Sequence, residues 1–152
     1  MILRLPRLTI PALLFSATVF SAEKRVKMEN LPPAVQKTVQ DQSRGATIHG
    51  LSQEVENGKT LYEAELKVNG RNKDLLIAAA GSVLEIEEEV ALDSVPAAAK
   101  GAIQKQAGKR QIVTVESVTK GRSVVAYEAK IKTAGKTSEV RVSPDGAPAK
   151  EP

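Results

Sequence analysis

The sequence predicts an α+β fold in which two short helices pack on an antiparallel sheet. Specifically, we expect a tandem repeat of one unit, a helix followed by an antiparallel β-meander. Three observations predict this fold: a tripeptide that recurs in the two halves, one apolar helical stripe opened by proline in each half, and alternating segments joined by Asn-Gly pairs. A helical period followed by a period of two residues is typical of a helix that leads into strands.

The repeat is marked by the tripeptide Tyr62-Glu63-Ala64, which returns as Tyr127-Glu128-Ala129. Three further residue pairs keep nearly the same spacing, namely Pro32 with Pro96, Gly70 with Gly135, and Gly81 with Gly146. We therefore expect one repeat over residues 31–90 and a second over 91–146. Because a unit of about 60 residues is marginal for independent folding, we expect the two repeats to share a core.

The first helix begins at Pro32, since a proline near the first turn loses no hydrogen bond there. Val35 and Val39 form an i, i+4 apolar stripe, and Gly45 ends the helix. The second unit repeats this pattern with Asp93 or Ser94 as the cap, Pro96 at the start, Ala99 and Ile103 in the stripe, and Gly108 at the end.

Strand patterns follow each helix. In the first unit they cover residues 48–56, 61–68, the region around 75–77, and 83–90; in the second they cover 112–119, 125–131 and 137–142. The pairs Asn57-Gly58 and Asn69-Gly70 predict tight hairpins, because both central residues of such a turn need a positive φ. The sheet is either continuous or made of two abutting halves, and the second unit has one strand fewer.

Residues 1–22 have the order of features of a secretory signal peptide. Arg4 and Arg7 precede an uncharged apolar stretch, and small residues follow at Ser21 and Ala22, either of which can be the cleavage point. A retained anchor is the alternative, but a membrane span needs about 20 apolar residues. We expect a periplasmic or secreted protein with no stable membrane span after processing, a flexible lead-in at 23–30 and a disordered tail at 147–152.

The composition excludes several classes of function. The chain has no Cys and one His, and removing Arg4 and Arg7 reduces 22 Lys+Arg to 20, against 18 Asp+Glu. Basic and acidic residues are interspersed and only 3% of residues are aromatic, so we expect no nucleic-acid partner. Without a nucleophile motif, a phosphate loop or paired His, we expect no cofactor and no enzymatic activity.

Three candidate sites carry competing interpretations. Glu85, Glu87 and Glu89 point the same way along a strand, so they could bind a cation such as Ca²⁺, although a solvated strand face is the favoured interpretation. His49 has no catalytic partner nearby in the sequence and is interpreted as a strand residue. Tyr62 and Tyr127 share their faces with aliphatic residues, which favours core packing over partner contacts.

The order of these motifs resembles the PepSY superfamily, in its tandem, β-lactamase-inhibitor-like form. The resemblance covers residues 31–146 and rests on the segments 31–35 and 95–99 at the helix starts, the Tyr-Glu-Ala pairs, Gly70 and Gly135, and the turn Pro144-Asp145-Gly146. The first unit departs from the family at Ala79-Ala80-Gly81, where the aspartate and the neighbouring aromatic residues of the family's turn are absent.

The resemblance implies a non-enzymatic, exported bacterial module that binds or regulates a protein of the cell envelope. A peptidase is one partner class that the family suggests, and the partner itself stays unknown. We expect the partner to use the exposed sheet face or an edge strand. The alternative is a small-ligand or cation-binding envelope protein that uses the acidic strand at 85–89.

Overall fold

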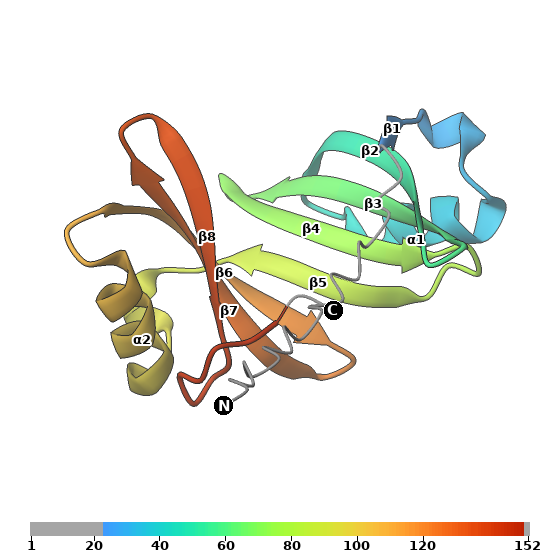
Figure 1. Cartoon of the computed structure of the whole chain (residues 1–152). Helices are drawn as coiled ribbons and strands as arrows, with labels where there is room; N and C mark the ends of the chain where they lie inside the picture. The colour runs from blue at the N-terminus through green and yellow to red at the C-terminus, as the bar shows by residue number, and fades with distance from the viewer. Residues whose placement is uncertain (1–22, 151–152) are drawn as a thin grey trace, which may run out of the picture.

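The computed structural model describes residues 23–150, which form one eight-stranded antiparallel sheet and two α-helices (Figure 1). The strands are β1 (Lys24–Arg25), β2 (Thr47–Glu56), β3 (Lys59–Val68), β4 (Arg71–Ala78), β5 (Val83–Glu89), β6 (Gln111–Lys120), β7 (Ser123–Thr133) and β8 (Lys136–Val142). The helices are α1 (Pro33–Gln42) and α2 (Ala97–Ala107), and the short 3₁₀ turns are η1 (Met28–Asn30) and η2 (Leu92–Ser94). The predicted signal peptide lies outside the described residues.

The strands follow one another across the sheet in chain order, from β1 to β8. The α+β class is confirmed, and the sheet is continuous, because β5 pairs with β6 from Ile86↔Thr119 to Glu89↔Glu116. Four strands follow α1 and three follow α2, as expected. Within residues 23–150, no helix is long and apolar enough to cross a membrane.

The two Asn-Gly pairs form the hairpins that the sequence predicts. Asn57 and Gly58 have φ values of 49° and 75° in the β2–β3 turn, and Asn69 and Gly70 have values of 50° and 82° in the β3–β4 turn. Two successive positive φ values are the signature of the type I′ turn, whose twist matches that of the flanking strands. These turns fix the register of the first three long strands.

Both helices lie on the same face of the sheet. Ile86 packs against the cluster of apolar residues beneath α1, and Glu88 points the same way two residues further on. Glu88 pairs with Ser117, and Val115, two residues before Ser117, belongs to the cluster beneath α2. The opposite face of the sheet therefore has no helix on it.

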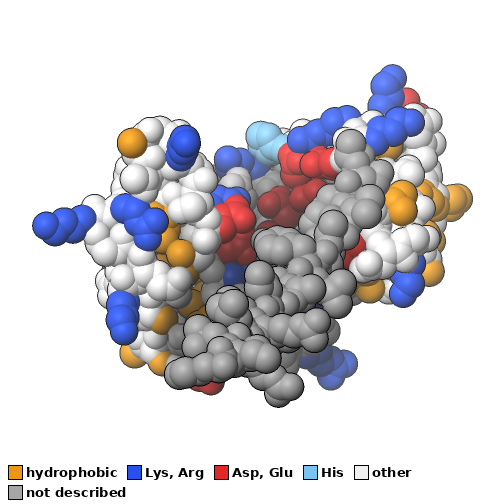
Figure 2. All heavy atoms as spheres, in the orientation of Figure 1, with side chains coloured by type: hydrophobic (Ala, Val, Ile, Leu, Met, Phe, Trp, Pro, Cys, Tyr) orange, Lys and Arg blue, Asp and Glu red, His pale blue; other side chains and the backbone are white. Residues whose placement is uncertain are grey.

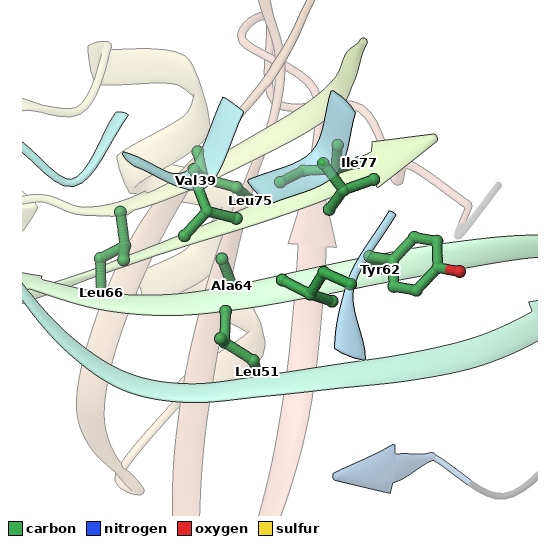
Figure 3. Close-up of a cluster of buried hydrophobic side chains, with 9 residues drawn as sticks. Val39, Leu51, Tyr62, Ala64, Leu66, Leu75 and Ile77 are labelled. Atoms are coloured by element: carbon green, nitrogen blue, oxygen red, sulfur yellow. The ribbon is translucent and has the colours of Figure 1, made fainter. Parts of the chain in front are cut away.

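Rather than one shared core, the buried apolar residues form two clusters, one beneath each helix. The first consists of Leu31, Val35, Val39, Leu51, Tyr62, Ala64, Leu66, Leu75 and Ile77 (Figure 3). The second consists of Val95, Ala99, Ile103, Val115, Ala129 and Val142. Each helix has only 10 or 11 residues and covers only the strands of its own half, so the core divides where the sheet runs on from β5 to β6.

Gly81 and Gly146 allow the chain to pass close to the helices. An added Cβ would lie 2.7 Å from the carbonyl oxygen of Ala34 at Gly81 and 2.6 Å from that of Ala98 at Gly146. Both glycines have positive φ values, 87° and 86°. A side chain at either position would push the helix away from the sheet.

The flanking segments are ordered, contrary to the flexible lead-in expected at 23–30. Lys24 and Arg25 pair with β2, and the amide of Val26 donates a hydrogen bond to the carbonyl of Leu51 at 2.9 Å. Val26 and Met28 also pack against the first cluster, so apolar burial fixes this segment.

The C-terminal residues 147–150, expected to belong to a disordered tail, return beside β8. Pro148 forms a bridge with Val142, and the amide of Ala149 donates to the carbonyl of Arg141 at 3.1 Å.

The start of the second helix also differs from expectation. Pro96 is its N-cap, whereas Asp93 and Ser94 belong to η2.

Candidate functional site

The helix-free face of the sheet is the candidate site, because acidic side chains gather there. Alternate residues of each strand point to this face, and the register of the sheet brings them together. The carboxylates on it are Glu54, Glu63, Glu65, Asp74, Glu85, Glu87, Glu89, Glu116, Glu128 and Glu139. Figure 2 shows acidic side chains in the hollow between the two halves of the molecule, with basic side chains around its upper edge.

The centre of this face is concave. Strands β7 and β8 run at a steep angle to β3 and β4, so the sheet bends between its halves (Figure 1). Near the bend, Val118 and Ala126 are buried on the helix-free side, and Glu116 is only 2% exposed. The face is therefore hollow rather than flat.

Several of the carboxylates have basic partners on the same face. Arg25 Nη2 lies 2.8 Å from Glu65, Lys120 Nζ lies 2.8 Å from Glu85, and Lys130 Nζ lies 3.4 Å from Glu116.

Arg141 is a further basic partner, and it lies at the far edge of the face. From the edge strand β8, it places Nη1 3.1 Å from Glu128 and Nη2 3.9 Å from Glu85. It thereby connects β8, β7 and β5 across the concave surface.

A second group of carboxylates lies around a pocket of about 150 Å³ beside β5. Its acidic lining includes Glu54, Glu63, Asp74 and Glu87, with Leu76 between them. Glu85 also lines the pocket and is ion-paired with Lys120 and Arg141. Among residues 23–150, no Lys or Arg nitrogen lies within 4.0 Å of the other four carboxylates. Most of the carboxylates of the pocket therefore have no ion-pair partner in the described part of the chain.

Burial and mutual repulsion raise the pKa values of three carboxyl groups in this pocket. Burial, followed by the charge of Asp74, raises the pKa of Glu63 to about 7. Burial and the charge of Glu116 raise the pKa of Asp74 to about 6, and burial and the charge of Glu128 raise that of Glu87 to about 8. Each charged carboxylate loses water and meets other negative charges, so the neutral form is favoured. Near pH 7 the pocket holds a mixture of carboxylic acids and carboxylates.

The three glutamates of the predicted cation site share this face but have different surroundings. Glu85 is paired with Lys120, Glu87 lines the acidic pocket, and Glu89 accepts a hydrogen bond from the amide of Asn72 at 3.1 Å. Across residues 23–150 there is no group of three or more His, Cys, Asp or Glu side chains placed to hold a metal ion. The cation-binding alternative stays a prediction.

The other residues singled out from the sequence lie away from the pocket or support the fold. His49 is exposed, at an irregularity in the β2–β3 pairing. Tyr62 belongs to the first core with its hydroxyl pointing away from the cluster (Figure 3), and Tyr127 is half-buried against the second. Pro32 and Pro96 are helix N-caps, and Gly70 and Gly135 lie in hairpin turns.

Sequence reasoning missed that Glu63 and Asp74 belong to the site. The alternation around Glu63 already placed it on the face opposite Tyr62 and Ala64. What the sequence did not contain was the register that sets Asp74 opposite Glu87 and Glu65.

Comparison with known proteins finds similarity in structure only. No family model and no curated protein matches the sequence. Among solved structures, a protein from Bacteroides eggerthii assigned to the periplasm matches with a TM-score of 0.62 and 16% identity, over 79% of this chain and 86% of that one. A DUF2874 family protein from Bacteroides ovatus matches with a TM-score of 0.59 and 18% identity, over 79% and 85%. A BLIP-like protein from Bacteroides fragilis matches with a TM-score of 0.55 and 20% identity, over 80% and 86%.

These three structures define the class of fold: the chain has the α+β architecture of BLIP-like and DUF2874 family proteins. At identities of 16–20% the likeness concerns the fold alone. Function is therefore inferred from the residues of the site on the helix-free face and not from the fold.

Proposed function

We propose that this protein is an exported, non-enzymatic binding module that receives a protein partner on the helix-free face of its sheet. The observation that carries this proposal is the position of both helices on one face of an eight-stranded sheet. The other face is concave, spans both halves and has no covering layer among the described residues. A large concave surface of this kind suits contact with another folded protein.

Export is supported by the signal-peptide features of residues 1–22 and by a structural neighbour assigned to the periplasm. The proposed location is the periplasm or the exterior of the cell, after cleavage at Ser21 or Ala22. The tandem PepSY-like repeat is supported by the paired tripeptides and by Gly81 and Gly146, each of which lies against the helix of its own half. The partner class that this resemblance suggests is a peptidase or another exported protein of the envelope.

The proposal is tested by capture from a periplasmic extract with the processed protein immobilised. Leu76 lines the pocket on the helix-free face, so Leu76→Trp adds bulk where the partner would bind. Val55→Trp is the matched control, because Val55 is an exposed apolar residue that points to the helix side of β2. We expect one protein to be captured by the wild type and by Val55→Trp and to be lost with Leu76→Trp. Equal capture by all three would contradict the proposal.

A further inference from the structure

Resting on the proposed binding function, we infer that the partner lays a Lys- or Arg-bearing segment across the concave face and inserts one basic side chain into the acidic pocket. The docking surface is the helix-free face of the sheet, and its occupant is a basic polypeptide segment. Three features of the surface identify that occupant: its charge, the size of its pocket and the arrangement of its carboxylates.

The charge of the face is not balanced by the described part of the chain. Ion pairs satisfy Glu65, Glu85, Glu116 and Glu128, and of these only Glu85 lines the pocket. The other four pocket carboxylates, Glu54, Glu63, Asp74 and Glu87, lie beyond 4.0 Å from any described Lys or Arg nitrogen. Unpaired, half-buried carboxylates are unfavourable in the free protein, because burial removes water without supplying a cation. A basic side chain from a partner supplies the missing charge.

The pocket has the size of one side chain rather than that of a drug-sized ligand. Its volume is about 150 Å³. Sites for drug-sized ligands usually measure about 300–1,000 Å³, whereas a single water needs about 10–15 Å³. The space therefore suits the end of a long side chain, with the rest of its polypeptide lying on the surrounding face.

The carboxylates come from different strands and surround the pocket. Glu54 lies on β2, Glu63 on β3, Asp74 on β4 and Glu87 on β5. A Lys ammonium group has three donors and an Arg guanidinium has five, so either can contact carboxylates on several strands at once. Because the pocket is half-buried, such ion pairs form in a less polar medium than ordinary surface pairs do.

Binding of a cation in this pocket is coupled to the release of protons. Glu63 faces Asp74 on β4 and Glu54 on β2, and Glu65 and Glu23 add further negative charge. Around Asp74 the neighbouring charges are those of Glu116, Glu65 and Lys130.

Around Glu87 the acidic neighbours are Glu128, Glu85 and Glu116, and Lys130 is the basic group that its charge reaches. Because most of these neighbours are negative, the free pocket retains protons near neutral pH, and an arriving cation displaces them. The basic segment should therefore bind more tightly at pH 9 than at pH 5.

The test measures binding of a short peptide of alternating Lys and Ser to the processed protein, by fluorescence anisotropy at low salt. The same peptide with Gln in place of Lys is the peptide control. We expect the Lys peptide to bind the wild type about tenfold more tightly than the Gln peptide, which corresponds to about 1.4 kcal/mol. Its affinity should fall to that of the Gln peptide in the triple variant Glu63→Gln, Asp74→Asn, Glu87→Gln.

A matched triple variant makes the same number of carboxyl-to-amide substitutions away from the pocket. Glu29→Gln, Glu88→Gln and Asp93→Asn remove three carboxylates whose side chains are 69%, 48% and 92% exposed. This control should bind the Lys peptide as the wild type does, and circular dichroism checks that both variants are folded. Equal binding of the two peptides, or equal loss in both triple variants, would overturn the inference.

The capture experiment distinguishes a failure of this inference from a failure of the proposed function. If Leu76→Trp abolishes capture but the pocket triple variant captures normally, the face is the docking surface and the basic-segment inference is wrong. If neither variant reduces capture, the proposed use of this face is wrong as well. Loss of capture with both variants supports both.

Discussion

Replacing Glu63 by Gln should remove part of the pH dependence of folding stability. Burial and the neighbouring acids raise the pKa of Glu63 from 4.5 to about 7. In the unfolded chain this carboxyl ionises near its ordinary pKa, so between pH 4.5 and about 7 the folded protein binds more protons than the unfolded one. The free energy of unfolding therefore falls as the pH rises through this window, and the loss is complete above the folded pKa.

The size of the effect follows from the same values. A rise in pKa from 4.5 to about 7 corresponds to about 3 kcal/mol at about 1.36 kcal/mol per pH unit. Solvent screening of a half-buried group reduces this to about 1–2 kcal/mol. Since Gln does not titrate, Glu63→Gln should gain about 1–2 kcal/mol over the wild type between pH 4 and pH 9.

The assay is urea unfolding of the wild type and Glu63→Gln at several pH values between 4 and 9. Glu88→Gln is the control, because Glu88 lies on the opposite face beside Lys73, with a side chain that is 48% exposed. Parallel pH profiles for the wild type and Glu63→Gln would refute the inferred burial of this carboxyl. A steeper loss in Glu63→Gln than in the wild type would refute it as well.

Three further predictions concern the fold and the cation alternative. In urea unfolding, Gly81→Ala should lower the free energy of unfolding by about 2–4 kcal/mol and Gly70→Ala by about 1–2 kcal/mol. Both residues have positive φ, but an added Cβ clashes with Ala34 only at Gly81. Equal losses in the two variants would contradict the close approach of Gly81 to the helix. Tyr62→Ala should lower the free energy of unfolding by about 3–5 kcal/mol, because the ring belongs to the first core. A fall in melting temperature much smaller than this loss implies would place Tyr62 outside the core. Millimolar Ca²⁺ should leave the melting temperature unchanged, because Glu85 is paired with Lys120 and Glu89 accepts from the amide of Asn72, so two of the three glutamates are already engaged. A chelator-reversible rise would instead support the cation site.

The sequence was sufficient to predict most elements of the fold, because their signals are local. Asn57-Gly58 needs no tertiary context to form a tight turn, and Val35 and Val39 mark the buried side of their helix on their own. The order of residues 147–150 could not be predicted, because it depends on a bridge between Val142 and Pro148 that has no sequence signal of its own.

The candidate site was only partly predictable. Alternation showed that Glu85, Glu87 and Glu89 share a face, but it could not show which neighbouring strand contributes the next carboxylate. That depends on register, and a shift of one residue would move Asp74 to the helix side. The shape of the face depends further on the bend of the sheet between its two halves, which arises from the whole assembly of strands.

The use of the helix-free face is tested most directly by site-specific photo-cross-linking. A photoreactive phenylalanine analogue is placed at position 76 on the helix-free face or at position 55 on the helix side, and each protein is irradiated with the periplasmic extract. We predict that position 76 forms a cross-link to one partner and that position 55 does not. Cross-linking from position 55 alone, or equally from both positions, would contradict docking on the helix-free face.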